Sequence, residues 1–195
     1  MKSIKSINRS NMTDIALGGA FLGTGGGGDP YIGRLMAEQA IDNYGPVNVL
    51  DVEALSDDAL VIPVCMMGAP TVMLEKLPRG DEAINALRSL EAVLGRKADA
   101  LFCIEAGGLN STIPIAVAAT AGLPIVDGDG MGRAFPELQM VSMTMFDIHA
   151  CPMAMADEKG NALVLNTVDN LSTEKFARVI TVEMGGAGLI ALYPM

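Results

Sequence analysis

Residues 100–133 read ALFCIEAGGLNSTIPIAVAATAGLPIVDGDGMGR, and this stretch decides the expected fold. Residues 100–104 form a short apolar run typical of a buried strand. Residues 111–121 form a small-residue helix that Gly122 closes, and residues 123–126 are a second apolar run. A strand, a helix and a second strand in this order predict two parallel strands joined by a crossover helix.

The chain before this stretch also alternates between expected strands and helices. Residues 47–52 and 60–66 read as strands, and residues 81–94 place their apolar side chains on one face of a helix. Two further helices are expected at residues 11–21 and 31–42, on either side of a glycine run. We therefore predict one α/β domain over residues 1–195, with a mostly parallel sheet and flanking helices.

The C-terminal third predicts a β-hairpin. Residues 152–156 and 162–167 flank the sequence DEKGN at residues 157–161, which is a strong turn signal. A helix is expected at residues 172–183, followed by an apolar segment at residues 189–193. Because this last segment has no polar tail, we expect a fragment, or a domain whose apolar end something else covers.

The composition limits the classes of partner. The net charge of −10 argues against nucleic acid and against an anionic membrane surface, since both attract basic patches. Three cysteines and an N-terminus without the apolar core of a signal peptide predict a reduced, cytoplasmic protein. Fourteen methionines, several of them in residues 140–155, favour a homo-oligomer or a partner domain that covers apolar surface.

Polar loops follow three of the expected strands. They lie at residues 66–70, 105–110 and 127–133. Ligands of parallel sheets bind outside the carboxyl ends of the strands, because the loops converge there. The sequence therefore predicts a small-molecule site at this edge of the sheet.

Four carboxylates stand in or near these loops: Glu105, Asp127, Asp129 and Glu137. Hard oxygen ligands of this kind suit a divalent metal ion, with Asp127 and Asp129 as its first ligands. The alternative is structural, because the aspartates can accept hydrogen bonds from loop N–H groups and from Arg133. A zinc site built from His149 and the cysteines is a further alternative, but its spacing matches no zinc finger, and buried thiols are favoured.

The glycine run at residues 23–28 contains the pattern G-x-G-x-x-G. A dinucleotide site needs a strand before that pattern, and a helix is expected here instead, so no nucleotide cofactor is expected. Gly25, Gly26 and Gly27 can offer backbone N–H groups beside a helix N-terminus as a pocket for an anion or a carbonyl oxygen. The alternative is a tight loop that lets two chain segments approach closely.

Three motifs resemble a known family. They are GTGGGGDP at residues 23–30, EAGGLN at residues 105–110 and DGDGMGRAFPELQ at residues 127–139. On these motifs the chain is similar to the N-terminal domain of the S-methyl thiohydantoin desulfurase-like family, a former domain of unknown function found beside hydantoinase and oxoprolinase genes. Members of that family are typically about twice as long, with a second domain after the point where this chain stops. The resemblance therefore implies that residues 1–195 are the N-terminal half of a longer family architecture.

The resemblance implies hydrolytic attack on a five-membered hydantoin or S-methyl thiohydantoin ring, or removal of the sulfur substituent of that ring. The matching positions are then candidate site residues: Glu105, Asp127, Asp129 and Glu137 for catalysis, and Gly25, Gly26, Gly27, Asn110 and Arg133 for binding the substrate. A carboxylate, with or without a metal ion, would activate water for attack at the ring carbon between the nitrogens. The alternative function is a non-catalytic partner or regulatory subunit of a hydantoinase or oxoprolinase complex.

Overall fold

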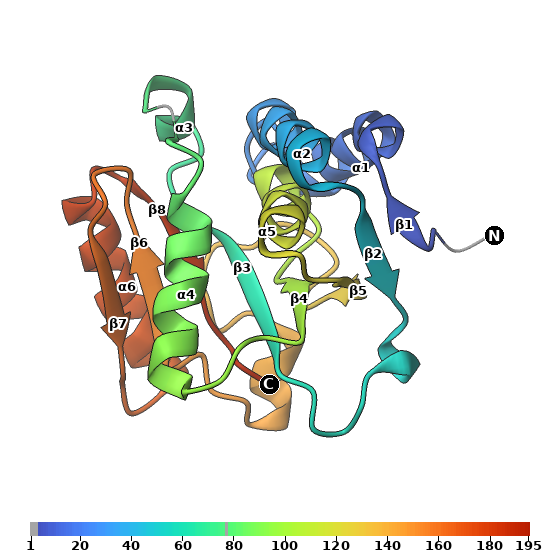
Figure 1. The fold of residues 1–195 in the computed structure, drawn as a ribbon. Helices are drawn as coiled ribbons and strands as arrows, with labels where there is room; N and C mark the ends of the chain where they lie inside the picture. The colour runs from blue at the N-terminus through green and yellow to red at the C-terminus, as the bar shows by residue number, and fades with distance from the viewer. Residues whose placement is uncertain (1–3, 77) are drawn as a thin grey trace.

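The structure is a computed structural model that describes residues 4–76 and 78–195 (Figure 1). Within these residues, eight strands form one sheet in the order β1-β2-β5-β4-β3-β8-β6-β7. The strands are β1 (Ser6–Ile7), β2 (Val47–Leu50), β3 (Val61–Gly68), β4 (Ala100–Cys103), β5 (Ile125–Asp129), β6 (Met153–Ala156), β7 (Ala162–Leu165) and β8 (Ala187–Ala191). The predicted α/β class and the C-terminal hairpin, formed by β6 and β7, are confirmed.

The sheet is mixed, so the prediction of a mostly parallel sheet was wrong. Strands β2, β5, β4 and β3 are parallel to one another, whereas β8 runs antiparallel to both β3 and β6. The edge strand β1 is antiparallel to β2. An apolar run reads the same in either direction, so strand direction depends on which neighbour the strand joins, and that is a tertiary property.

Helices cover both faces of the sheet. The helices longer than one turn are α1 (Met12–Gly23), α2 (Tyr31–Tyr44), α4 (Glu82–Leu94), α5 (Ile113–Ala121) and α6 (Asn170–Glu183), and α3 (Val72–Glu75) is a single turn. Figure 1 shows α4 and α5 in front of the sheet and α6 behind it. As predicted, α5 connects the parallel strands β4 and β5.

Alternation along β3 explains how one strand serves two cores. Val64 and Met66 pack with the side chains of α2, α4 and α5, whereas Cys65 and Met67 pack with Ala177 of α6. Successive side chains of a strand point to opposite faces, so an unbroken apolar run is what a strand covered on both faces requires.

Strand β5 extends further than predicted. It continues to Asp129 rather than ending at Val126. Leu101 of β4 pairs with Ile125, but Cys103 pairs with Asp129, so β5 carries extra residues at Asp127 and Gly128. Such a bulge turns the local backbone outward, and Asp127 and Gly128 are both exposed.

Among the described residues, no helix is long and apolar enough to cross a membrane.

Candidate active site

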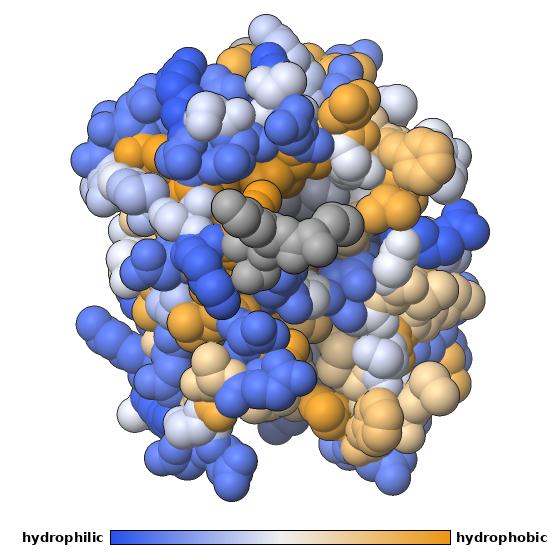
Figure 2. Space-filling model, turned by 90° about the vertical axis from the view of Figure 1, so that its right-hand side faces the viewer, coloured by the Kyte–Doolittle hydropathy of each residue, from blue (hydrophilic) through white to orange (hydrophobic). Residues whose placement is uncertain are grey.

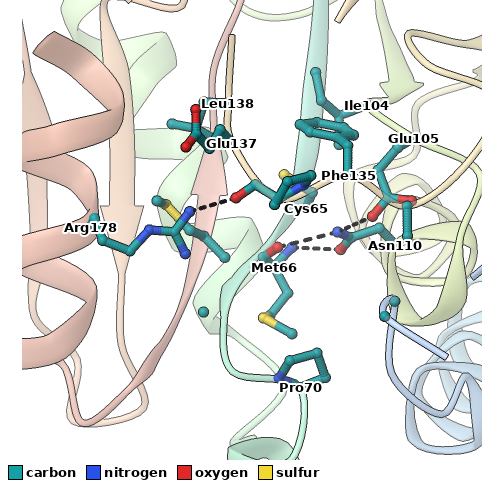
Figure 3. Close-up of a pocket in the computed structure, with 16 residues that line it drawn as sticks. Cys65, Met66, Pro70, Ile104, Glu105, Asn110, Phe135, Glu137, Leu138 and Arg178 are labelled. Atoms are coloured by element: carbon teal, nitrogen blue, oxygen red, sulfur yellow. Dashed lines mark hydrogen bonds between the residues drawn. The ribbon is translucent and has the colours of Figure 1, made fainter. Parts of the chain in front are cut away.

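A cavity of about 260 Å³ lies at the carboxyl ends of β3 and β4 (Figure 3). Its wall comes from different parts of the chain, namely the glycine run, the end of β3 with the segment that follows it, the loop after β4, a segment that follows β5, and Arg178 of α6. Its residues are Gly26, Gly27, Cys65, Met66, Met67, Gly68, Pro70, Ile104, Glu105, Asn110, Ala134, Phe135, Pro136, Glu137, Leu138 and Arg178. The site therefore lies at the sheet edge that the strand-end rule predicts.

Glu105 and Asn110 form a buried polar pair on the cavity wall. Both residues follow β4, and Asn110 belongs to the short 3-10 helix Gly108–Ser111. The Asn110 amide donates to Oε1 of Glu105 at 2.8 Å and to the carbonyl oxygen of Met66 at 3.2 Å, while its oxygen accepts from the Met66 N–H at 2.7 Å. Asn110 thus fixes the carboxyl group of Glu105 against the end of β3 (Figure 3).

The second oxygen of Glu105 differs from the first. Its Oε2 atom is buried and has no hydrogen-bond partner among the described residues, and Glu105 as a whole is only 4% exposed. Burial raises the pKa of Glu105 from its ordinary value of 4.5 to about 7; the hydrogen bond from Asn110 opposes this rise, and the Asp129 carboxylate adds to it. A carboxyl group with such a pKa exchanges protons readily near neutral pH, as a general acid or base must.

Two glycine loops interlock beside this pair. A Cβ atom added to Gly108, whose φ is +59°, would lie 1.9 Å from the carbonyl oxygen of Gly27. A Cβ atom on Gly27 would lie 2.8 Å from the carbonyl carbon of Gly107. The Leu109 N–H donates to the Gly27 oxygen at 3.0 Å. The glycines of both motifs therefore serve close backbone approach, which is the structural alternative raised from the sequence.

Two of the N–H groups that were expected to bind substrate already donate hydrogen bonds within the glycine run. The amides of Gly26 and Gly27 both donate to the Gly23 carbonyl oxygen, at 2.8 and 3.2 Å. Gly26 and Gly27 still line the cavity, and Gly25 lies on a neighbouring cavity instead. Because Gly26 and Gly27 carry no side chains, they leave the cavity wider at this part of its wall.

Two thiols lie next to Glu105. Cys103 donates to the carbonyl oxygens of Glu105 and Asn110, at 2.9 and 3.1 Å, and so supports the loop that carries both. Cys65 lines the cavity itself. Burial, together with the nearby Glu105 carboxylate, raises the pKa of Cys65 and of Cys103. Both side chains are therefore neutral thiols at physiological pH.

An ion pair on α6 holds the opposite rim of the cavity. Arg178 donates to Oε1 of Glu174 at 2.6 Å and to the carbonyl oxygen of Pro136 at 2.8 Å. Glu174 in turn accepts from the Leu138 N–H at 3.0 Å. Sequence reasoning missed Arg178 and Cys65 as cavity residues. Arg178 reaches the cavity because β8 lies next to β3, and that neighbour relation carries no local sequence signal.

The predicted site residues divide into two groups. Glu105, Asn110, Gly26, Gly27 and Glu137 all lie on the cavity wall. The other members of the predicted set lie away from that wall: Gly25, Asp127, Asp129 and Arg133. The part of the wall that follows β5 thus comes from residues 134–138, directly after the predicted loop at residues 127–133.

Asp129 and Arg133 take part in loop contacts. Oδ2 of Asp129 accepts from the backbone N–H groups of Ala106 and Gly132, both at 2.7 Å. Arg133 donates to the Thr24 hydroxyl at 3.3 Å and to the Ala134 carbonyl oxygen at 3.0 Å. Asp129 therefore ties the loop after β5 to the loop after β4, which carries Glu105.

In the part of the chain that the structure describes, no three His, Cys, Asp or Glu side chains come together as a metal site requires. Asp127 is exposed on the bulge, and one oxygen of Asp129 is engaged by two amides. These donors do not fit a metal centre made by this chain alone. A divalent ion at Asp127 and Asp129 stays a prediction that a metal analysis can test.

Comparison with known proteins supplies the family. The sequence profile of the S-Me-THD-like N-terminal domain matches residues 10–167, which include the glycine run, the Glu105 to Asn110 loop and the segment at the rim. The chain belongs to the S-Me-THD-like N-terminal domain family. No curated protein matches the chain.

This S-Me-THD-like domain is also similar to a solved structure. A crystal structure of a protein from Chromobacterium violaceum superposes with a TM-score of 0.79 at 28% sequence identity. The similarity covers 98% of this chain and 55% of the other. The S-Me-THD-like domain thus spans about half the length of the solved chain that it matches.

Proposed function

We propose that the chain forms a hydrolytic site for a hydantoin or S-methyl thiohydantoin ring, with Glu105 as the residue that accepts the proton from water. The supporting observation is the carboxyl group of Glu105. Glu105 lines the cavity; one of its oxygens is fixed by Asn110, and the other is buried without a hydrogen-bond partner in the part of the chain that the structure describes. A buried polar atom without a partner is costly, so such an atom in a cavity favours a ligand or water that completes it.

The proposed reaction replaces the methylthio group of the ring by oxygen. Water transfers a proton to Oε2 of Glu105 while its oxygen bonds to the ring carbon between the two nitrogens. The carbon–sulfur bond then breaks, and the sulfur leaves as methanethiol with the proton from Glu105. The remaining hydroxyl proton moves to a ring nitrogen, which gives the hydantoin. Water is the only co-reactant, so the step balances without an oxidant or a metal ion.

The surroundings of Glu105 suit this role. The cavity is small and water is largely excluded from the carboxyl group, which strengthens its interaction with a bound polar ring. The neutral thiols of Cys65 and Cys103 add no charge that would compete with the carboxylate. The proposed class of substrate rests on the family, and the proposed role of Glu105 as the base rests on the geometry of the cavity.

Activity on S-methyl thiohydantoins tests the proposal, with released methanethiol measured by a thiol reagent. We expect Glu105→Gln to abolish release, because an amide accepts no proton from water, while the exposed Glu53→Gln serves as the matched control. We also expect kcat/KM to rise with pH around a midpoint near 7, since only ionised Glu105 is a base. Full activity of Glu105→Gln would refute the proposal.

A second candidate function is a binding partner of a larger enzyme. Large apolar side chains stand exposed after β5, with Met145 82% and Phe146 76% accessible. Figure 2 shows orange and tan side chains gathered along the right of the face turned to the viewer. Exposed apolar surface of this kind favours a protein interface. Stable association with a hydantoinase or oxoprolinase, without turnover by the chain itself, would favour this candidate.

A further inference from the structure

A second cavity shares a wall with the proposed active site. Its volume is about 450 Å³, and it lies between the glycine run, the start of α2 and the helix α3. Gly26 and Pro70 line both cavities. The two cavities are therefore neighbours, and the boundary between them contains one residue of the glycine run and one residue after β3.

The chemistry of the two cavities differs. The first contains Glu105, Asn110 and Arg178. The second is lined mainly by apolar side chains, namely Ala20, Ile32, Pro70, Met73, Leu74 and Leu109. Asp29 is its charged member, and the carboxylate of Asp29 already accepts from the Tyr31 N–H at 2.9 Å. The second cavity thus offers an apolar wall to a ligand.

Gly26 contributes no side chain to the wall that the two cavities share. A Cβ atom added to Gly26 would meet the Gly23 carbonyl oxygen at 3.7 Å, so a side chain fits at this residue. Further along the run, a Cβ atom on Gly28 would lie 2.7 Å from the Cβ atom of Pro70, so the glycine run contacts Pro70 there.

We infer that the second cavity binds an apolar substituent on ring carbon 5 of the substrate, while the ring occupies the first cavity. This inference rests on the proposed function, because it takes the ring to lie beside Glu105. Leu74 is 60% exposed in the free chain, so a branched alkyl group bound there removes apolar surface of both molecules from water. The natural substrates then belong to the class of ring compounds derived from apolar amino acids.

The experiment measures binding, so it is independent of turnover. Hydantoin and 5-isobutylhydantoin are titrated separately into the 195-residue chain, and binding is followed by NMR. Burial of one methylene strengthens binding about fourfold, so we expect 5-isobutylhydantoin to bind at least about tenfold more tightly. Equal affinities of the two ligands, or no binding of either, would overturn the inference.

Two variants locate the substituent. Leu74→Asn replaces an exposed wall residue, and Gly26→Val adds a side chain at a residue that lines both cavities and where a Cβ atom fits. Each is expected to reduce the affinity ratio to about threefold or less. The matched control is Val93→Asn, which replaces a residue on α4 that is 59% exposed and lines neither cavity, and it keeps the ratio. An unchanged ratio in both wall variants would also overturn the inference.

The two proposals fail in different ways. If Glu105→Gln keeps its activity, or no S-methyl thiohydantoin is hydrolysed, while the affinity ratio behaves as expected, the catalytic role of Glu105 is wrong and the substituent site stands. If hydrolysis depends on Glu105, but the rate and the affinity are the same with and without the substituent on ring carbon 5, the second cavity is not part of the substrate site.

Discussion

Replacement of Glu105 by glutamine should make the free energy of unfolding less dependent on pH. The folded-state pKa of about 7 lies above the ordinary value of 4.5, so the folded protein binds more protons than the unfolded chain between these values. The stability that protonated Glu105 contributes to the folded state is therefore fully present below about pH 4.5, and it is lost as pH rises through about 7. At about 1.4 kcal/mol per pKa unit, the ionised carboxylate costs about 3 kcal/mol at pH 8.

Glutamine removes this cost because it does not ionise. Its oxygen still accepts the hydrogen bond that Asn110 now gives to Oε1, whereas its NH₂ group takes the place of the partnerless Oε2 atom. An unsatisfied amide costs about 1–3 kcal/mol, and it does so at every pH. The useful quantity is therefore the stability of the variant minus that of the wild type, compared at two pH values.

Urea unfolding at pH 5 and pH 8 measures this quantity. Because part of this cost is already present at pH 5, we expect the difference between variant and wild type to become more favourable to the variant by about 2.5 kcal/mol from pH 5 to pH 8. Glu53→Gln is the control, since Glu53 is exposed, and its difference should change by less than about 0.5 kcal/mol. A change below about 1 kcal/mol for Glu105→Gln would show that Glu105 is not held in a desolvated environment and would remove the basis of its proposed role.

Three further predictions concern the supports of the site. Asn110→Ala removes three hydrogen bonds, so urea unfolding should show a loss of about 2–4 kcal/mol; a loss below about 1 kcal/mol would contradict this. Gly108→Ala should lower the free energy of unfolding by at least about 3 kcal/mol, because its Cβ atom would meet the Gly27 oxygen. Gly122 also has a positive φ but has nothing within 4 Å, so Gly122→Ala should lower the free energy of unfolding by about 1–2 kcal/mol. Equal losses of stability in the two variants would contradict the close contact between the loops. Arg178→Gln should speed hydrogen exchange at the Leu138 amide, because Arg178 orients the Glu174 carboxylate that accepts from it, and an unchanged rate would mean that Glu174 keeps its position alone.

Local patterns predicted the elements well. The apolar runs of β4 and β5 and the small-residue helix between them are complete within one stretch of sequence, so strand, helix and strand were predictable. The DEKGN turn likewise predicted the hairpin of β6 and β7. Glu105 and Asn110 could be selected because each follows a strand whose carboxyl end was predicted.

Long-range pairing limited the rest. Strand β8 joins β3 from the end of the chain, so neither the mixed sheet nor the position of Arg178 beside the cavity follows from local periodicity. The bulge in β5 also lacks a signal in the apolar pattern, which is why Asp127 was expected in the site and is instead exposed on the strand. Sequence reasoning therefore gives the edge of the sheet at which the cavity lies, but not every residue that lines the cavity.

The contact between Gly27 and the Gly107–Gly108 pair has a consequence for how the domain can evolve. A side chain at Gly27 or Gly108 collides with backbone atoms of the other loop, and backbone cannot rotate away as a side chain can. Divergence at one loop is then possible only together with a matching change at the other, although about 80 residues separate them in the chain. We therefore expect the two motifs to change together, and a protein that retains only one of them should have lost the geometry around Glu105.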